Sequence, residues 1–155
     1  SEMHYQPSYK SQEGPRVLPP PESVPVTGRE FRYASLDEYR PLTIPQPVAE
    51  SYDGAMVEEV YRVNCLMCHG ANMRGEGPTA AVMEKRGLSP LPANLTLEMT
   101  QESLPGEIFA FITEGGRQGY ALIEKDRESA SPMPAFQFLL TEQERWMLVK
   151  YILDR

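Results

Sequence analysis

Three residues with the chemistry for holding a metal-containing cofactor lie within five positions of the sequence, at Cys65, Cys68 and His69. Two thiols separated by two residues can reach the two vinyl groups of one porphyrin and form thioether bonds with it. The imidazole directly after the second thiol then lies under the iron as its proximal ligand. The spacing Cys-x-x-Cys-His therefore predicts one covalently bound haem c, with His69 as an iron ligand.

The same cysteine spacing occurs in zinc sites and in thioredoxin-like redox pairs. A structural zinc ion takes four nitrogen or sulfur ligands, whereas the sequence holds two cysteines and two histidines, of which His4 lies far upstream. A redox Cys-x-x-Cys pair belongs to a βαβ unit, and no strand pattern surrounds this one. The ligand count and the lack of predicted strands favour haem attachment over both alternatives.

A second axial ligand is predicted at Met133. Prolines on both sides of it keep the backbone out of a helix, so that the thioether can be directed from a loop. Methionine opposite histidine is one of the ligand pairs found at haem iron. Met73 and Met99 are the alternative ligands.

Apolar residues three to four positions apart predict a helix over residues 49–64 that leads into the haem-attachment motif. Ser51 or Asp53 can cap its start. A capping box formed by Thr141 and Glu144 predicts the beginning of a C-terminal helix.

Between these two helices the sequence predicts shorter helices and irregular segments. One helix over residues 79–86 stops at Gly87, where a helix end favours glycine. Another begins with Pro105 in its first turn. The proline-containing segment 88–96 is predicted to be extended, and the charged residues 117–131 to form a surface excursion. The predicted fold class is all-α.

Residues 1–48 contain nine of the fifteen prolines, so neither a long helix nor a central strand can form there. Aromatic residues are nevertheless spread through this segment, at Tyr5, Tyr9, Phe31, Tyr33 and Tyr39. We therefore predict an extended arm over residues 1–48 that packs on partner subunits, followed by a haem domain over residues 49–155. The alternative for the arm is a disordered tail.

The net charge of −7 is spread unevenly, with −1 on residues 1–48 and −6 on residues 49–155. An acidic domain is a poor binder of nucleic acid and suits basic surfaces on protein partners, although the charge can also serve solubility alone. The sequence has no run of eighteen apolar residues, so we expect no direct span of a bilayer.

The order of motifs after residue 48 resembles the class I cytochrome c family. The matching strings are Cys65-x-x-Cys68-His69-Gly70, Gly75-x-Gly77-Pro78, Pro92-Ala93-Asn94-Leu95, Phe111-Ile112-x-x-Gly115, Met133-Pro134-Ala135-Phe136, and a last helix with Trp146 and Tyr151. The resemblance implies a haem wrapped by about four helices with its edge exposed. It also implies that the first and last helices cross near Tyr61. Val57 departs from the small residue that many members have at the crossing, and Gly54 is a possible substitute.

The resemblance also implies roles for particular residues. His69 and Met133 are the expected iron ligands, and Pro78 and Asn94 join the two cysteines in the haem-binding set. The carbonyl of Pro78 is expected to accept a hydrogen bond from Nδ1 of His69, which would fix the ring and tune its basicity.

The N-terminal segment is similar to the mono-haem cytochrome c subunits (ActE) of the bacterial alternative complex III, which oxidises quinol at a membrane. The strings that carry the similarity are Met3-His4-x-Gln6-Pro7, Pro15-Arg16 and Pro25-Val26-x-Gly28. Members of that family are commonly lipoproteins with an N-terminal cysteine. The sequence begins Ser1-Glu2-Met3 without that cysteine or an apolar leader, so we expect that a signal was removed or that partners alone provide anchoring.

The expected function is electron transfer rather than enzymatic catalysis, because a six-coordinate His/Met iron has no vacant position for a substrate. The expected partners are the other subunits of a membrane oxidoreductase complex, respiratory or photosynthetic, with a redox donor and acceptor. The expected location is peripheral, on the periplasmic face of a bacterial membrane. Alternatives are a free periplasmic shuttle, a cytochrome subunit of another oxidoreductase, and a haem-based gas sensor. The sensor would need a polar distal residue, which residues 132–136 do not supply.

Overall fold

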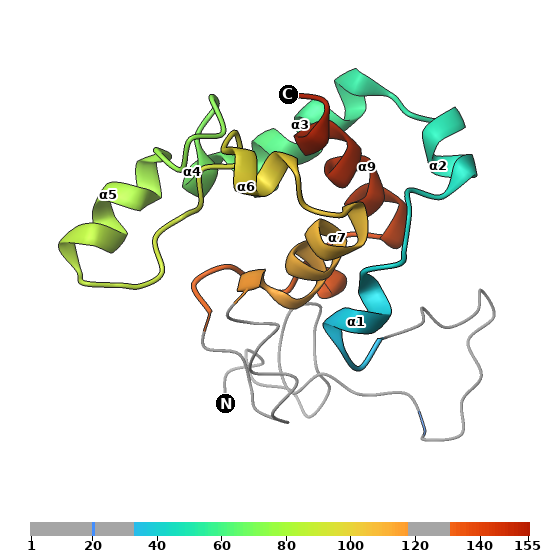
Figure 1. Ribbon diagram of the computed structural model, residues 1–155. Helices are drawn as coiled ribbons and strands as arrows, with labels where there is room; N and C mark the ends of the chain where they lie inside the picture. The colour runs from blue at the N-terminus through green and yellow to red at the C-terminus, as the bar shows by residue number, and fades with distance from the viewer. Residues whose placement is uncertain (1–19, 21–32, 118–130) are drawn as a thin grey trace, which may run out of the picture. The chain divides into compact units, whose positions relative to one another are not determined.

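The computed structural model describes Pro20, residues 33–117 and residues 131–155 (Figure 1). The elements in this part of the chain are α1 (Leu36–Tyr39), α2 (Gln46–Glu50), α3 (Gly54–Asn64), α4 (Leu66–His69), α5 (Pro78–Lys85), α6 (Glu98–Gln101), α7 (Pro105–Glu114), the 3₁₀ turn η1 (Phe136–Phe138) and α9 (Glu142–Leu153). The described residues contain helices and no strand, which confirms the all-α prediction. The predicted surface excursion lies outside the described residues except for its two ends.

The helix before the haem-attachment motif begins later than predicted. Asp53 caps α3, because its Oδ1 accepts hydrogen bonds from the backbone N–H groups of Ala55 (2.9 Å) and Met56 (3.1 Å). Residues 46–50 form the separate helix α2, which has a proline in its first turn. The predicted helix over residues 49–64 is therefore two elements joined by a short break.

The starts of α7 and α9 and the end of α7 agree with their local signals. The capping box at α9 is present, with Glu144 N–H donating to Thr141 Oγ1 (3.2 Å) and Thr141 N–H donating to Glu144 Oε2 (2.8 Å). Helix α7 begins with Pro105 and is followed by Gly115 at φ +87°, a left-handed conformation that favours glycine. The short helix α6 was not predicted, because a single turn shows too little hydrophobic periodicity to be detected in the sequence.

The core lies where α9 packs against both α3 and α7. The rings of Phe109 on α7 and Trp146 on α9 stack at 4.1 Å between centroids and 8° between planes. Tyr61 on α3 and Tyr151 on α9 lie 5.6 Å apart, which agrees with the predicted crossing of the first and last helices. Val57 is fully buried in this core.

Gly54 does not substitute for a small residue at that crossing. A Cβ built on Gly54 would have Tyr52 Cε1, at 4.0 Å, as its nearest described neighbour. Tyr52 does not belong to α9, and no atom of α9 lies within 4 Å of this Cβ. Gly54 therefore does not permit a close approach of α9.

The end of the predicted arm packs on the helical core of the same chain. Tyr39 is 1% exposed, and its ring lies 6.2 Å from the ring of Phe109. Arg40 Nε forms an ion pair with Glu107 Oε1 on α7 at 2.8 Å. The compact unit accordingly runs from Arg32 to Arg155.

This boundary differs from the one predicted at residue 49. The prolines of residues 33–48 prevent a long helix, but they permit the single turn of α1 and the short α2, and these bury Tyr39 and Val48. Residues 33–48 thus belong to the helical domain. The rest of the predicted arm, apart from Pro20, lies outside the described residues.

The contact between α1 and α7 depends on a glycine. A Cβ on Gly106 would lie 1.9 Å from the carbonyl oxygen of Tyr39, which is backbone and cannot rotate away. We expect Gly106→Ala to lower the free energy of unfolding by about 2 kcal/mol or more. Urea unfolding followed by far-UV circular dichroism measures it.

Gly54→Ala is the matched control, because Gly54 also lies in the first turn of a helix and a Cβ there would make only an ordinary van der Waals contact with Tyr52. It should be neutral or slightly stabilising. Equal stability of the two variants would show that α1 can move away from α7 without lowering the free energy of unfolding.

Candidate cofactor site

The haem-attachment motif is held by one tight turn at the end of α3. Cys65 N–H donates to the carbonyl of Tyr61 (2.8 Å) and His69 N–H donates to the carbonyl of Cys65 (2.9 Å), which forms α4. This turn places Cys65, Cys68 and His69 on the wall of one cavity of about 450 Å³. The three predicted residues therefore share one site.

The glycine loop after α4 packs its backbone directly against the motif. A Cβ on Gly77 would lie 2.4 Å from the carbonyl oxygen of Met67 and 2.6 Å from that of Cys68. Gly75 N–H donates to the carbonyl of His69 (2.8 Å) and Gly77 N–H to that of Cys68 (3.1 Å). The loop thus fixes α4 and, through it, the histidine.

Nδ1 of His69 lies 2.9 Å from the carbonyl oxygen of Ala93. A carbonyl oxygen can only accept, so Nδ1 carries the proton and Nε2 keeps its lone pair for a metal. Burial lowers the pKa of His69, and the bond to Ala93 opposes that shift in part. The imidazole is consequently held in the neutral form that binds iron.

The prediction that the Pro78 carbonyl accepts this hydrogen bond is corrected by the contact with Ala93. Pro78 is exposed and is the first residue of α5, where its carbonyl is directed along the helix axis. Ala93 can come close because Gly75, with φ +79°, has no side chain. A Cβ built on Gly75 would lie 2.3 Å from the carbonyl oxygen of Pro92, in the segment that contains Ala93. Leu95 N–H also donates to the carbonyl of Met73 (2.7 Å) and fixes the same segment.

The two cysteines are not joined by a disulfide. Burial, reinforced by the neighbouring Cys68, raises the pKa of the Cys65 thiol to about 12. Both side chains are partly buried on the cavity wall. Both sulfur atoms thus belong to the cavity that the covalent haem motif borders.

Met133 lines the same cavity as His69. Its loop is pressed against the end of α7, where a Cβ on Gly115 would lie 2.6 Å from the carbonyl oxygen of Met133. Met133 N–H donates to Ser131 Oγ (3.3 Å). The structure thus brings the two predicted axial ligands to one cavity, and the assignment of Met133 as an iron ligand remains a prediction.

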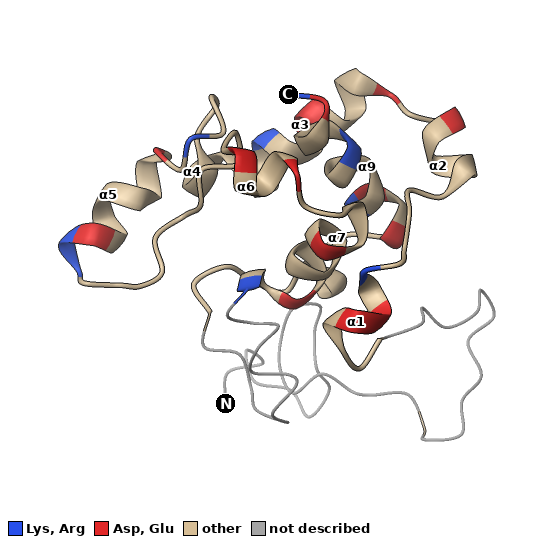
Figure 2. Ribbon diagram, in the orientation of Figure 1, with Lys and Arg blue, Asp and Glu red and all other residues tan. Residues whose placement is uncertain are grey.

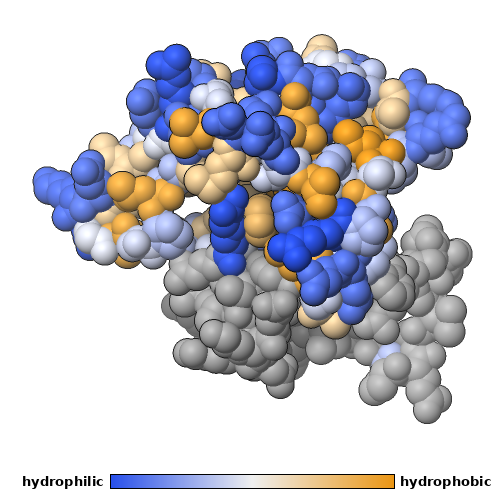
Figure 3. Space-filling model, in the orientation of Figure 1, coloured by the Kyte–Doolittle hydropathy of each residue, from blue (hydrophilic) through white to orange (hydrophobic). Residues whose placement is uncertain are grey.

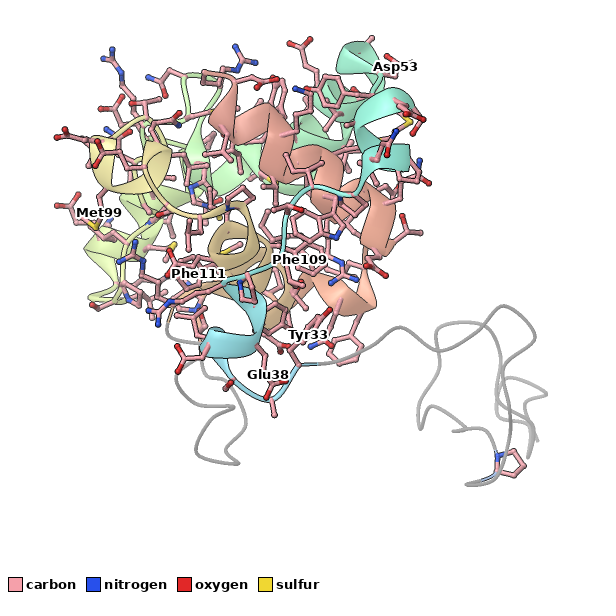
Figure 4. All side chains as sticks on the ribbon, turned by 45° about the vertical axis from the view of Figure 1, so that its right-hand side comes forward. Tyr33, Glu38, Asp53, Met99, Phe109 and Phe111 are labelled. Atoms are coloured by element: carbon pink, nitrogen blue, oxygen red, sulfur yellow. The ribbon has the colours of Figure 1, made fainter. Side chains whose placement is uncertain are left out.

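The other candidate residues have different positions. Asn94 lines the cavity, while its Oδ1 accepts hydrogen bonds from Thr96 N–H (2.9 Å) and Oγ1 (2.8 Å), so it shapes a turn. Met99 on α6 also lines the cavity and is 63% exposed (Figure 4). Met73 is 2% exposed and packs in the core.

The remaining cavity wall is mostly apolar. Its buried and half-buried side chains include Leu95, Ile108, Phe111, Ile112, Phe136 and Leu148. Arg117 also lines the cavity, with its guanidinium carbon 5.1 Å from the centroid of the Phe111 ring. Two thiols, an imidazole with a free Nε2, a thioether and an apolar wall together suit an apolar macrocycle that carries iron. The residues present fit haem c.

Sequence reasoning missed Ala93 and Arg117 as site residues. The contact of Ala93 is made by its backbone, so its side chain carries no signal. Arg117 looked like the first residue of a charged surface segment, but it directly follows the two glycines after α7 and lies on the cavity wall.

A covalent haem motif and a methionine loop on one cavity, in a helical domain, define a c-type cytochrome. The cytochrome c family model matches residues 55–155, and the chain belongs to this family. A stretch of 28 residues, 18% of the chain, is 54% identical to cytochrome c-550 of Virgibacillus halodenitrificans and covers 80% of that relative. The protein accordingly carries covalently bound haem c on Cys65 and Cys68, and it is an electron-transfer protein.

The surface mixes charges with small apolar areas. Acidic residues lie on α1, α6 and α7, and basic residues lie at the far end of α5 (Figure 2). On the face shown in Figure 3, apolar areas alternate with hydrophilic ones.

No helix among residues 33–117 and 131–155 is both long and apolar enough to cross a membrane.

Proposed function

We propose that this protein is the electron-transfer subunit of a membrane quinol-oxidising complex, with a haem c whose iron is held by His69 and Met133. The observation that carries the electron-transfer part is the shared cavity of His69, Met133 and the two cysteines. When bound, the haem supplies one-electron redox chemistry. The chain supplies both axial groups, a fixed histidine tautomer and an apolar wall.

The surroundings of Met133 support electron transfer over gas sensing. A sensor holds its diatomic ligand with a polar distal residue. Here Met133 is flanked by Pro132 and Pro134 and packs, partly buried, against the hydrophobic core, to which Phe136 belongs. A loop of this kind favours a persistent bond from sulfur to iron.

The assignment to a complex rests on the chain before Arg32. Residues 1–31 hold six prolines together with Tyr5, Tyr9 and Phe31, and they carry the strings similar to the mono-haem subunits of the alternative complex III. Ordering a segment of this length costs on the order of a kcal/mol for each residue. A large, permanent interface with other subunits offsets such a cost, and a transient encounter does not. The proposed location is the periplasmic face of the membrane.

Deletion of residues 1–31 tests this proposal. A cut after Phe31 leaves the compact unit from Arg32 intact, whereas a longer deletion that includes Tyr39 would damage the core. We expect the truncated holoprotein to keep the visible spectrum and reduction potential of the full chain and to lose co-migration with its membrane partners on native gels.

Retained association would contradict the proposed role of residues 1–31. It would indicate a free shuttle that docks through its acidic domain. In that case raising the salt concentration should release the full chain and the truncated chain alike. The full chain in a stable complex should resist the same salt.

A further inference from the structure

A buried carboxylate joins three distant parts of the chain. Glu114, the last residue of α7, is 1% exposed. Its Oε1 accepts a hydrogen bond from the hydroxyl of Tyr39 (3.0 Å), and its Oε2 accepts one from Nε2 of Gln137 (3.0 Å). We name the side chains of Tyr39, Glu114 and Gln137 the Glu114 clasp.

The clasp adjoins the methionine loop on both sides. Immediately after Glu114, a Cβ on Gly115 would lie 2.6 Å from the carbonyl oxygen of Met133, and one on Gly116 would lie 3.4 Å from its Sδ. Gln137 lies in η1, the turn that directly follows the loop. The carboxylate therefore ties the end of α7, against which Met133 packs, to the turn where the Met133 loop ends.

We propose that the Glu114 clasp is a positioning device that keeps the Met133 thioether on the haem iron. This inference rests on the proposed ligation by Met133. Hydrogen bonds to a buried carboxylate are strong, so the loss of the one from Tyr39 or from Gln137 weakens the hold of the carboxylate on that segment. When the hydrogen bond from Gln137 is lost, η1 can shift away from α7. The Met133 loop then moves with η1 and displaces the sulfur of Met133.

The clasp also explains why residues 33–48 belong to the helical domain. Tyr39 donates from α1, and its ring lies 4.7 Å from the ring of Tyr33 and 6.2 Å from the ring of Phe109 on α7. A segment that was predicted to belong to the extended arm thus contributes a hydrogen bond to the support of the proposed iron ligand.

Competition with imidazole measures the proposed effect on the full-length oxidised holoprotein. External imidazole binds the iron only when Met133 has left it, so its apparent affinity is proportional to the fraction of protein with Met133 off. Tyr39→Phe and Gln137→Leu each remove one donor and keep most of the side-chain volume. We expect imidazole affinity to rise on the order of tenfold in each, with a weaker Met–iron absorption band.

Two controls separate positioning from general stability. Glu107→Gln removes the ion pair with Arg40 across the same contact between α1 and α7, and it should leave imidazole affinity within about twofold. Val57→Ala opens the core in α3 and should lower the unfolding midpoint without changing imidazole affinity. If the clasp variants behave like Val57→Ala, the clasp is merely structural and the proposal is overturned.

Titration of Met133→Ala with imidazole distinguishes two negative outcomes. In one, the clasp does not position Met133, and in the other, Met133 is not the iron ligand. Met133→Ala should bind imidazole more tightly than any clasp variant. If it binds imidazole as the unsubstituted protein does, Met133 is not the ligand, and the clasp proposal fails together with that assignment.

Discussion

Met133→Ala is expected to retain the haem but to lose the Met–iron absorption band and to lower the reduction potential by more than about 59 mV, a tenfold change in the ratio of oxidised to reduced protein. The thioether favours ferrous iron and keeps water away from it. An alanine at this position leaves the iron to water or to a lysine side chain. Redox titration with visible spectroscopy measures both effects.

Met99→Ala is the matched control, because Met99 lines the same cavity and is largely exposed. It should leave the band and the potential unchanged. If Met133→Ala instead leaves both unchanged, Met133 packs against the haem without binding iron. Loss of the band in Met99→Ala would then assign Met99 as the ligand.

The double variant with Cys65→Ala and Cys68→Ala is expected to lose covalent haem completely. Thioether bonds need the two thiols, and no other cysteine exists in the sequence. Acid-acetone extraction should remove all haem from this variant and none from the unsubstituted protein. After extraction, the unsubstituted chain should still carry the mass of one haem, and the chain of the variant should not.

Each single variant should keep one thioether bond. Tyr61→Phe provides a control for damage to the end of α3, because it removes a buried hydroxyl that donates to the carbonyl of Gly70 (2.7 Å) and leaves both thiols in place. Its haem should resist extraction. Haem that is extractable from the unsubstituted protein would contradict covalent attachment.

The chemistry of the site could be predicted from the sequence because it is encoded locally. Thioether attachment and proximal ligation depend on the spacing of five residues, Cys65 to His69. The starts of α7 and α9 follow from Pro105 and from the capping box of Thr141 and Glu144, which act within one turn. Such signals need no knowledge of the rest of the chain.

The membership of residues 33–48 in the domain depended on tertiary structure. Their prolines correctly exclude a long helix, but composition cannot tell which surface an aromatic side chain covers. Tyr39 is buried against α7 because Gly106 permits the close approach of two backbone segments that are far apart in the sequence. Such a close fit between two backbone segments leaves no periodic pattern in the sequence.

The support of the predicted iron ligands was likewise decided by the fold. The family resemblance implied the Pro78 carbonyl as the partner of His69, and the structure has Ala93, a residue whose contribution is a backbone oxygen. Glu114 was not singled out by any sequence motif, yet it is buried and accepts hydrogen bonds from Tyr39 and Gln137. The sequence alone determined which side chains can hold a haem, because covalent and ligand chemistry is a property of residue type and spacing. Only the tertiary structure decided what holds those side chains in place, because hydrogen bonds between distant segments depend on how the helices pack.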